Sequence, residues 1–167
     1  YPDTGIRALH DVSFTVHKGQ KIAIIGKTGS GKTTIAEMLL RTFDPTSGQI
    51  LIDGVDLKDL DLNVWRKMVG YVPQDNFLFS DTIENNIRFG RDEANESELQ
   101  AAASKCMIHK ENSELPKGYQ TRIGERGVSL SGGQKQRTSI ARALIKNLKI
   151  LILDDALSAV DANTEQE

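Results

Sequence analysis

Hydrophobic and polar positions follow two periods along this chain, one typical of strands and one typical of helices. Residues 12–16 (VSFTV) alternate apolar and polar side chains, as a half-buried strand does. Residues 21–25 (KIAII) and 149–155 (KILILDD) are nearly continuous apolar runs, which indicate buried parallel strands. Two further strands are predicted, one in residues 49–54 before a turn and one in residues 68–74 before a proline stop.

The segments between these runs repeat their apolar positions with the helical period. Residues 32–43 combine helix-forming side chains with one apolar side. Residues 81–89 and 95–108 each begin with residues that cap helices well. Residues 132–147 predict a long amphipathic helix. The chain therefore reads as an α/β core interrupted by a helical segment.

A glycine-rich loop joins the apolar run at residues 21–25 to the helix that follows it. Its spacing, Gly-x4-Gly-Lys-Thr, is that of the phosphate-binding P-loop, and it lies between a strand and a helix as that loop requires. Glycines let the backbone approach the phosphates closely, and backbone N–H groups surround them. We expect Lys32 to neutralise phosphate oxygens and the Thr33 hydroxyl to hold Mg²⁺. The predicted phosphate-binding residues here are Gly26, Lys27, Thr28, Gly29, Ser30, Gly31, Lys32, Thr33 and Thr34.

The second half of a P-loop site is predicted at the end of the last apolar run. Residues 149–155 deliver Asp154 to the carboxyl edge of the sheet, where a P-loop protein holds its magnesium ion. The predicted fold is therefore a P-loop NTPase of the RecA-like α/β class, with antiparallel strands at its N-terminal side. We assign residues 1–74 and 147–167 to the ATP-binding core and residues 75–146 to an inserted helical subdomain.

Composition narrows the class of protein further. With 167 residues, 38% of them hydrophobic, the chain suits one compact domain. A net charge of −2 gives no basic field for nucleic acid, so no nucleic-acid partner is expected. The single cysteine, Cys106, excludes an internal disulfide framework and fits a reducing cytoplasm. No apolar stretch approaches the length of a membrane span, so we expect a soluble piece of a longer polypeptide.

Four further motifs resemble those of the ABC transporter ATPases, in the same order and over essentially the whole chain. "LSGGQ", placed at the start of a helix, is similar to the signature motif; it comprises Leu130, Ser131, Gly132, Gly133 and Gln134. "YVPQ" ends in Gln74, which resembles the glutamine that contacts Mg²⁺. "SAVD" at residues 158–161 resembles the D-loop, and "TRIGERG" at residues 121–127 resembles the X-loop of exporters.

This resemblance implies a head-to-tail pair of nucleotide-binding domains with two ATP molecules at their interface. Each ATP contacts the P-loop of one domain and the signature of the other. The Ser131 hydroxyl and the following N–H groups then form a second anion site at a helix start. The implied exporter sits at the cytoplasmic face of the cell membrane, with a transmembrane domain fused upstream.

The resemblance extends to two recognition features. Tyr1 precedes a proline ahead of the first strand, as does the aromatic residue that stacks on adenine in exporters. Residues 74–90 are expected to face the transmembrane domain, with Phe77, Leu78 and Phe79 as docking residues.

Two departures from the family pattern bear on activity. Asp155 stands where these ATPases usually have the glutamate that polarises the attacking water. Its side chain is one methylene shorter, and a displacement of about 1 Å can slow a reaction about 10²-fold. Exporters with this aspartate resemble heterodimers, so Asp155 and Gln74 are predicted to serve a weak site and the partner chain is expected to be non-identical. The switch histidine is expected beyond the last residue, so the fragment alone should hydrolyse ATP poorly.

Other classes of P-loop protein account for fewer of these sequence features. A P-loop kinase leaves "LSGGQ" and "SAVD" unexplained. Soluble ABC proteins of DNA repair place a long coiled coil between P-loop and signature, and too few residues separate Lys32 from Ser131 to hold one. Translation-type members carry two cassettes and lack the exporter-like "TRIGERG". An importer ATPase is the nearest alternative, since its membrane subunits are normally separate chains.

Overall fold

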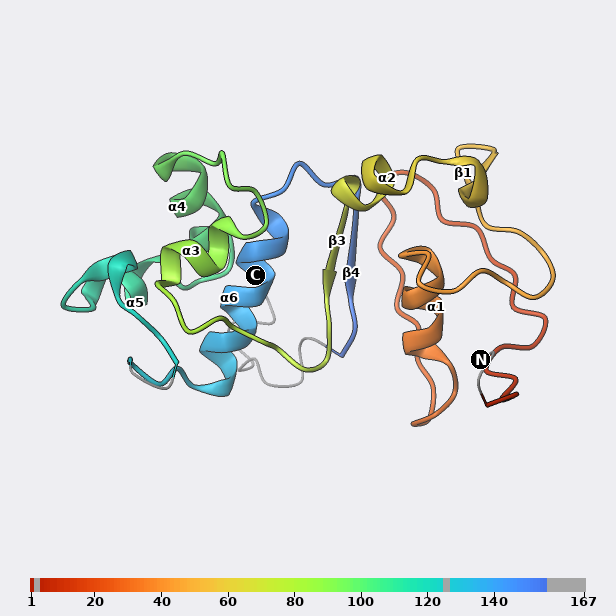
Figure 1. Cartoon of the computed structure of the whole chain (residues 1–167), viewed down its shortest axis with the longest axis horizontal. Coiled ribbons are helices and arrows are strands. Elements are labelled where there is room, and N and C mark those ends of the chain that lie inside the picture. The colour runs from red at the N-terminus through yellow and green to blue at the C-terminus, as the bar shows by residue number, and fades with distance from the viewer. Residues whose placement is uncertain (2–3, 125–126, 156–167) are drawn as a thin grey trace. The chain divides into compact units, whose positions relative to one another are not determined.

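The computed structural model describes residues 1, 4–124 and 127–155 and divides into two compact units, residues 1–62 and 63–167 (Figure 1). The division falls at the start of helix α2 (Leu62–Met68).

The first unit contains one helix and a short hairpin. Helix α1 (Lys32–Leu39) follows the glycine-rich loop and ends earlier than predicted, since the backbone turns left-handed at Arg41 (φ 52°). Strands β1 (Leu51–Ile52) and β2 (Val55–Asp56) pair antiparallel and lead into the 3-10 helix η1 (Leu57–Asp59). Both residues of the two-residue turn, Asp53 and Gly54, have positive φ angles of 49° and 85°. That is the twist that such hairpins require.

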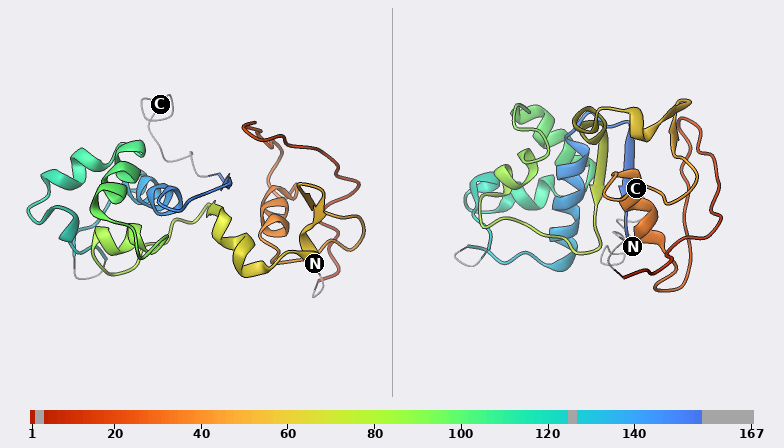
Figure 2. Two further views of the ribbon diagram at one scale, coloured as in Figure 1. Left: turned by 90° about the horizontal axis from the view of Figure 1, so that it is seen from above. Right: turned by 45° about the vertical axis from the view of Figure 1, so that its right-hand side comes forward.

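The strands predicted at residues 12–16 and 21–25 are wrong for this structure. Both segments are extended but form no strand, as the trace ahead of α1 shows in Figure 2. Their apolar side chains are exposed, up to 93% for Ile25. A strand exists only through hydrogen bonds to a neighbour. Among the described residues of the first unit, no segment supplies that neighbour to either stretch.

The second unit contains a parallel pair of strands. Strand β3 (Val69–Val72) pairs with β4 (Ile150–Leu153) in register, from Val69 opposite Ile150 to Val72 opposite Leu153. β3 is buried, as expected of a parallel strand. The prediction that β4 is buried is wrong for alternate residues, because Leu151 and Leu153 are each 39% exposed while Ile150 and Ile152 are half-buried. Alternate side chains point to opposite faces of a strand, and only one face of β4 is packed.

Helices α3 (Ile83–Arg88), α4 (Glu96–Lys105) and α6 (Gly132–Leu144) pack together in the second unit (Figure 1). Helix α5 (His109–Glu114) contacts α4 and the 3-10 helix η2 (Gly118–Gln120). The core of this bundle contains Ile83, Ile87, Ala94, Leu99, Ala102, Ala103, Cys106, Ile108, Ile123, Leu130, Ala141 and Ile145. Burial raises the pKa of the Cys106 thiol to about 12, so this side chain stays neutral.

Candidate functional site

The glycine-rich loop is shaped to expose backbone N–H groups. Gly29 and Gly31 adopt positive φ angles of 79° and 89°, which side chains with a Cβ rarely tolerate. A Cβ on Gly31 would also lie 2.7 Å from the carbonyl oxygen of Ala8. Gly31 is the N-cap of α1, and no side chain caps that end. The first-turn N–H groups of α1 therefore have no side-chain acceptor, which is the arrangement that binds phosphate at a helix start.

Lys32 lies over this loop. Its Nζ donates hydrogen bonds to the carbonyl oxygens of Gly26, at 2.9 Å, and Lys27, at 3.0 Å. These bonds fold the side chain back along the loop and hold the ammonium group beside it. The loop thus combines a positive charge with the N–H groups at the start of α1, and both favour an anion.

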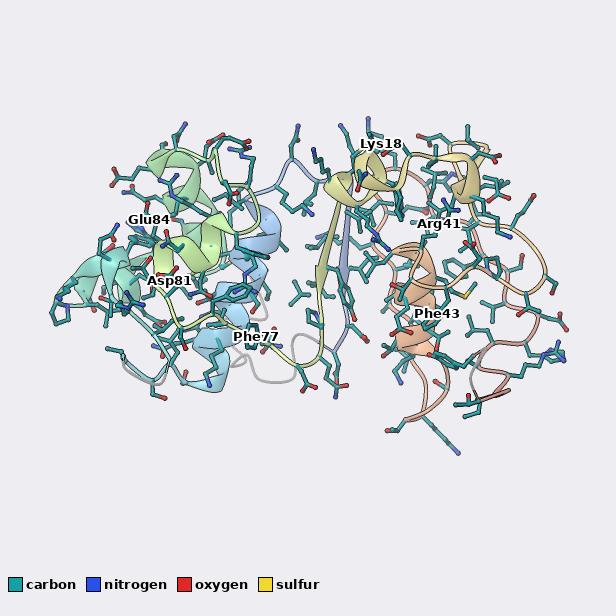
Figure 3. The ribbon with its side chains drawn as sticks, in the orientation of Figure 1. Lys18, Arg41, Phe43, Phe77, Asp81 and Glu84 are labelled. Atoms are coloured by element: carbon teal, nitrogen blue, oxygen red, sulfur yellow. The ribbon has the colours of Figure 1, made fainter. Side chains whose placement is uncertain are left out.

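Tyr1 lies beside the same helix. Its hydroxyl is 2.7 Å from Thr34 Oγ1 and donates to Glu37 Oε2 at 3.2 Å. Its ring meets Phe43 edge to face, with centroids 5.2 Å apart (Figure 3 labels Phe43). The structure thus brings Tyr1 to the helix that follows the phosphate loop, and the residue as a whole remains 42% exposed.

The predicted magnesium side of the site forms at the ends of β3 and β4. Asp154 continues the pairing of the two strands, since its N–H donates to Val72 O at 3.0 Å. Its carboxylate accepts a hydrogen bond from the Tyr71 hydroxyl at 3.3 Å. Gln74 Nε2 donates to Asp155 Oδ2 at 3.4 Å. The parallel strands therefore bring Gln74, Asp154 and Asp155 together, although residues 74 and 155 are far apart in sequence.

Asp155 has an unusual backbone. Its φ of 52° lies in the left-handed region, which aspartate tolerates better than most residues. The carboxylate that the sequence singled out as nonstandard thus follows β4 on a left-handed backbone.

The signature stretch begins helix α6. Ser131 is the N-cap, and its Oγ accepts a hydrogen bond from Gln134 N at 3.2 Å. In return Gln134 Oε1 accepts from Ser131 N at 2.9 Å, which completes a capping box. This cap engages the third N–H of the helix and leaves those of Gly132 and Gly133 to other acceptors. Leu130, just ahead of the cap, is buried in the bundle core.

The segment after Gln74 exposes aromatic side chains. Phe77 is 66% exposed, Phe79 37% and Phe89 63%, whereas Leu78 packs against the core. Figure 3 shows Phe77 in the connection from β3 to α3, with Asp81 and Glu84 at the start of that helix. A cavity of about 660 Å³ opens beside them; its lining residues are Phe79, Ser80, Asp81, Asn85, Arg88, Phe89 and Asp92. This face therefore presents aromatic side chains together with acidic and basic side chains.

Arg142 of α6 contacts residues 77–89 through hydrogen bonds and through two aromatic rings. Its guanidinium donates to Asn86 O at 2.8 Å, to Asn86 Oδ1 at 3.0 Å and to Phe77 O at 2.9 Å. It also lies over the rings of Phe79 and Phe89, 5.5 and 5.9 Å from their centroids. Asn86 is almost fully buried, and its side-chain amide donates a hydrogen bond to Phe79 O at 3.0 Å.

Sequence reasoning missed Arg142 and Asn86, and also the pair of Glu111 and Arg137. Arg137 is 8% exposed and donates to Glu111 Oε1 at 2.6 Å. A signal was available for Arg142, which stands in the sequence between two buried alanines of α6, Ala141 and Ala143. None was available for Glu111, which lies in the uniformly polar stretch "HKENSE".

Two of the predicted motifs extend beyond the described residues. The D-loop-like residues 158–161 lie outside the described residues, as do Glu125 and Arg126 of the X-loop-like stretch. The phosphate loop and Tyr1 belong to the first unit, whereas Gln74, Asp154, Asp155 and the signature belong to the second.

A family model described as ABC transporter matches residues 9–158. This chain belongs to the ABC transporter family. It is an ATP-binding domain of P-loop NTPase fold, mixed α/β, as the motifs predicted.

Relatives in the ABC transporter family match nearly the whole chain. A "probable multidrug resistance ABC transporter ATP-binding/permease protein" of Bacillus subtilis (strain 168) is 53% identical over 99% of this chain and 28% of its own length. An "ATM1-type heavy metal exporter" of Novosphingobium aromaticivorans is 50% identical over 95% of this chain and 26% of its own length. A solved bacterial Atm1-family ABC exporter with ATP bound superposes with a TM-score of 0.90. It has 50% identity over 95% of this chain and 28% of that one.

The chain thus spans little more than a quarter of the length of these relatives. None of the helices in the described part of the chain is long and apolar enough to cross a membrane.

Proposed function

We propose that this chain is the ATP-binding and ATP-hydrolysing domain of an ABC exporter. ATP draws it into a dimer with a second nucleotide-binding domain, and hydrolysis separates the two. The single observation that carries this proposal is a phosphate loop and a capped "LSGGQ" helix start in one chain. Its relatives are named as exporters or multidrug transport proteins, which supports export by a transmembrane domain fused upstream.

The residues present fit a magnesium–ATP complex. Lys32 and the start of α1 bind the phosphates, the Thr33 hydroxyl and the side chains of Gln74 and Asp154 hold the ion, and Tyr1 stacks on the base. All these metal donors are oxygen atoms, which Mg²⁺ prefers. Among the described residues no group of three His, Cys, Asp or Glu side chains could hold a metal. When bound, Mg²⁺ neutralises the charge that develops on the phosphates.

Asp155 makes this chain's own site the weaker one of the dimer. As the residue after the magnesium ligand, it is the base that orients the attacking water, with Gln74 beside it. Its carboxylate reaches less far than that of a glutamate would. Its left-handed backbone and the hydrogen bond from Gln74 limit how far the side chain can shift to make up the difference. The intact signature, residues 130–134, completes the competent site of a non-identical partner chain.

The aromatic face of the second unit receives the transmembrane domain at the cytoplasmic side of the membrane. Its exposed Phe77, Phe79 and Phe89 supply apolar contact area, and the adjoining cavity can accept a protruding helix end. Because Arg142 ties this face to α6, movement of the signature helix moves the docking face with it.

Steady-state ATPase of the purified full-length pair tests this assignment, one variant at a time. Ser131→Arg should depress turnover severely, because a long charged side chain blocks the signature at the competent site. Asp155→Glu should not reduce turnover and should raise it if the weak site gains reach. Asp155→Ala should leave most of the turnover intact.

The opposite pattern refutes the asymmetry. If Ser131→Arg is harmless while Asp155→Ala removes all turnover, this chain's own site is the working one. A matched control is Ser129→Arg, an exposed position ahead of the signature outside the capping box, which should retain turnover.

A further inference from the structure

The capping box at the signature depends on the orientation of one side-chain amide. Gln134 Oε1 accepts from Ser131 N, so its Nε2 must point the other way. Rotating the amide by 180° would set Nε2 against the Ser131 N–H, two donors facing each other. Whatever binds Nε2 therefore decides whether the box closes.

Glu111 of α5 supplies that partner. Gln134 Nε2 donates to Glu111 Oε2 at 2.9 Å. A carboxylate only accepts hydrogen bonds, so it stabilises the amide with its nitrogen outward and its oxygen toward Ser131. Glu111 thereby favours the one amide orientation that closes the box.

The second oxygen of Glu111 binds the same helix one turn later. Arg137 donates to Oε1 at 2.6 Å, and its side chain is only 9% exposed. Positions 134 and 137 lie on one face of α6, so the carboxylate spans them as a clamp. Arg137 also neutralises Glu111, which would otherwise place an unpaired negative charge near a helix start that must accept phosphate.

We infer that Glu111 is a positioning residue for the signature. It acts through Gln134 and Arg137 to hold residues 131–134 in the conformation that presents the Gly132 and Gly133 N–H groups to the nucleotide of the partner domain. This inference rests on the proposed function, in which that nucleotide is the ATP of the competent site.

The test uses the full-length transporter with its partner subunit and measures ATP turnover, the KM for ATP and the melting temperature. Glu111→Ala should lower kcat about tenfold, the effect of losing one hydrogen bond to a charged group. Glu111→Gln keeps one acceptor for Gln134 and should recover part of that loss. The matched control is Glu114→Ala, since Glu114 ends the same helix with a 68% exposed side chain and should leave kcat unchanged.

A double-mutant cycle separates this role from general stability. If Glu111 acts through Gln134, adding Glu111→Ala to Gln134→Ala should change kcat by less than about twofold. A purely structural role would lower the melting temperature and leave kcat per folded molecule unchanged. If Glu111→Ala does not accumulate, Glu111→Gln carries the same test, with a reduced kcat expected at an unchanged KM.

The outcomes separate the two claims. Turnover that survives Ser131→Arg overturns the asymmetry of the dimer and this inference with it, and a wild-type pair without ATPase activity overturns the proposed function as a whole. If Ser131→Arg abolishes turnover while both Glu111 variants match Glu114→Ala, only the role of Glu111 is overturned. Independent, multiplying losses at Glu111 and Gln134 overturn it as well.

Discussion

Helix α1 of the first unit begins differently from helices α3, α4 and α6 of the second unit. In the second unit, Thr82, Asn95 and Ser131 cap α3, α4 and α6 by accepting a hydrogen bond from a backbone N–H of the first turn. In the first unit, α1 starts at Gly31 and no side chain caps it. A capped helix start is stable on its own, whereas an uncapped one leaves its N–H groups to a ligand.

The second unit also buries more of its apolar side chains than the first unit does. The second unit has a continuous apolar core around α3, α4 and α6. The first unit leaves large aliphatic side chains such as Ile25 exposed. The comparison teaches that the second unit derives its stability from packing and that the first unit is arranged around a binding loop.

The largest effect is expected from removing the charge at the uncapped helix. Lys32→Ala should weaken ATP binding more than about 100-fold, the equivalent of about 3 kcal/mol for a hydrogen-bonded charge pair. Binding of a fluorescent ATP analogue to the full-length protein measures this loss. Lys58→Ala, at an exposed position in the same unit, is the control and should bind normally. Unchanged affinity in Lys32→Ala would overturn the placement of the nucleotide.

The next effect compares one isoleucine from each unit. In the 167-residue chain, Ile83→Ala should lower the free energy of unfolding by about 2–5 kcal/mol, because Ile83 is fully buried and truncation leaves a cavity. Ile25→Ala should change it by less than about 0.5 kcal/mol, since Ile25 is 93% exposed. Denaturant titration measures both. An equal loss at Ile25 would show that residues 21–25 are covered in solution, and the contrast between units would disappear.

A smaller effect is expected from a cap that has no proposed ligand. Asn95 closes a capping box with Glu98, so Asn95→Ala should cost about 1 kcal/mol of stability. Lys105→Ala, at the exposed last position of α4, is the control and should stay within about 0.5 kcal/mol. Thermal unfolding of the three proteins gives the comparison. A silent Asn95→Ala would mean that side-chain caps are not what distinguishes the second unit.

The smallest expected effect is a change in stability at low pH. The pKa of Asp81 lies below its ordinary value because the Thr82 N–H and then the Asn85 side chain donate to its carboxylate. A lowered folded-state pKa contributes stability above the unfolded-state pKa, and this is lost as the pH falls through the folded-state pKa. Asp81→Asn should therefore be slightly less stable than wild type at pH 7, and the gap should close in strong acid. Asp92→Asn, an exposed carboxylate of the same unit, should show no such gap. Parallel pH curves for Asp81→Asn and wild type would contradict this linkage.

The local backbone of the glycine-rich loop and of the signature helix start could be predicted from the sequence, because short spacing specifies it. Glycine suits the positive φ of residues 29 and 31 better than other residues do, and the lysine and threonine directly after them fall at a helix start. The capping box of Ser131 and Gln134 likewise needs only a three-residue spacing. Helices α3, α4 and α6 formed close to their predicted bounds for the same reason, since caps and helical periodicity are properties of neighbouring residues.

Pairing and burial were decided by the tertiary structure. Residues 21–25 and 149–155 look alike as apolar runs, yet only the second became a strand, because β3 lies beside it and supplies hydrogen bonds. The meeting of Gln74 with Asp155, of Arg142 with Asn86, and of Glu111 with Gln134 joins residues from separate elements. Such contacts depend on how strands align and helices pack over long sequence separations, and local pattern carries no information about them.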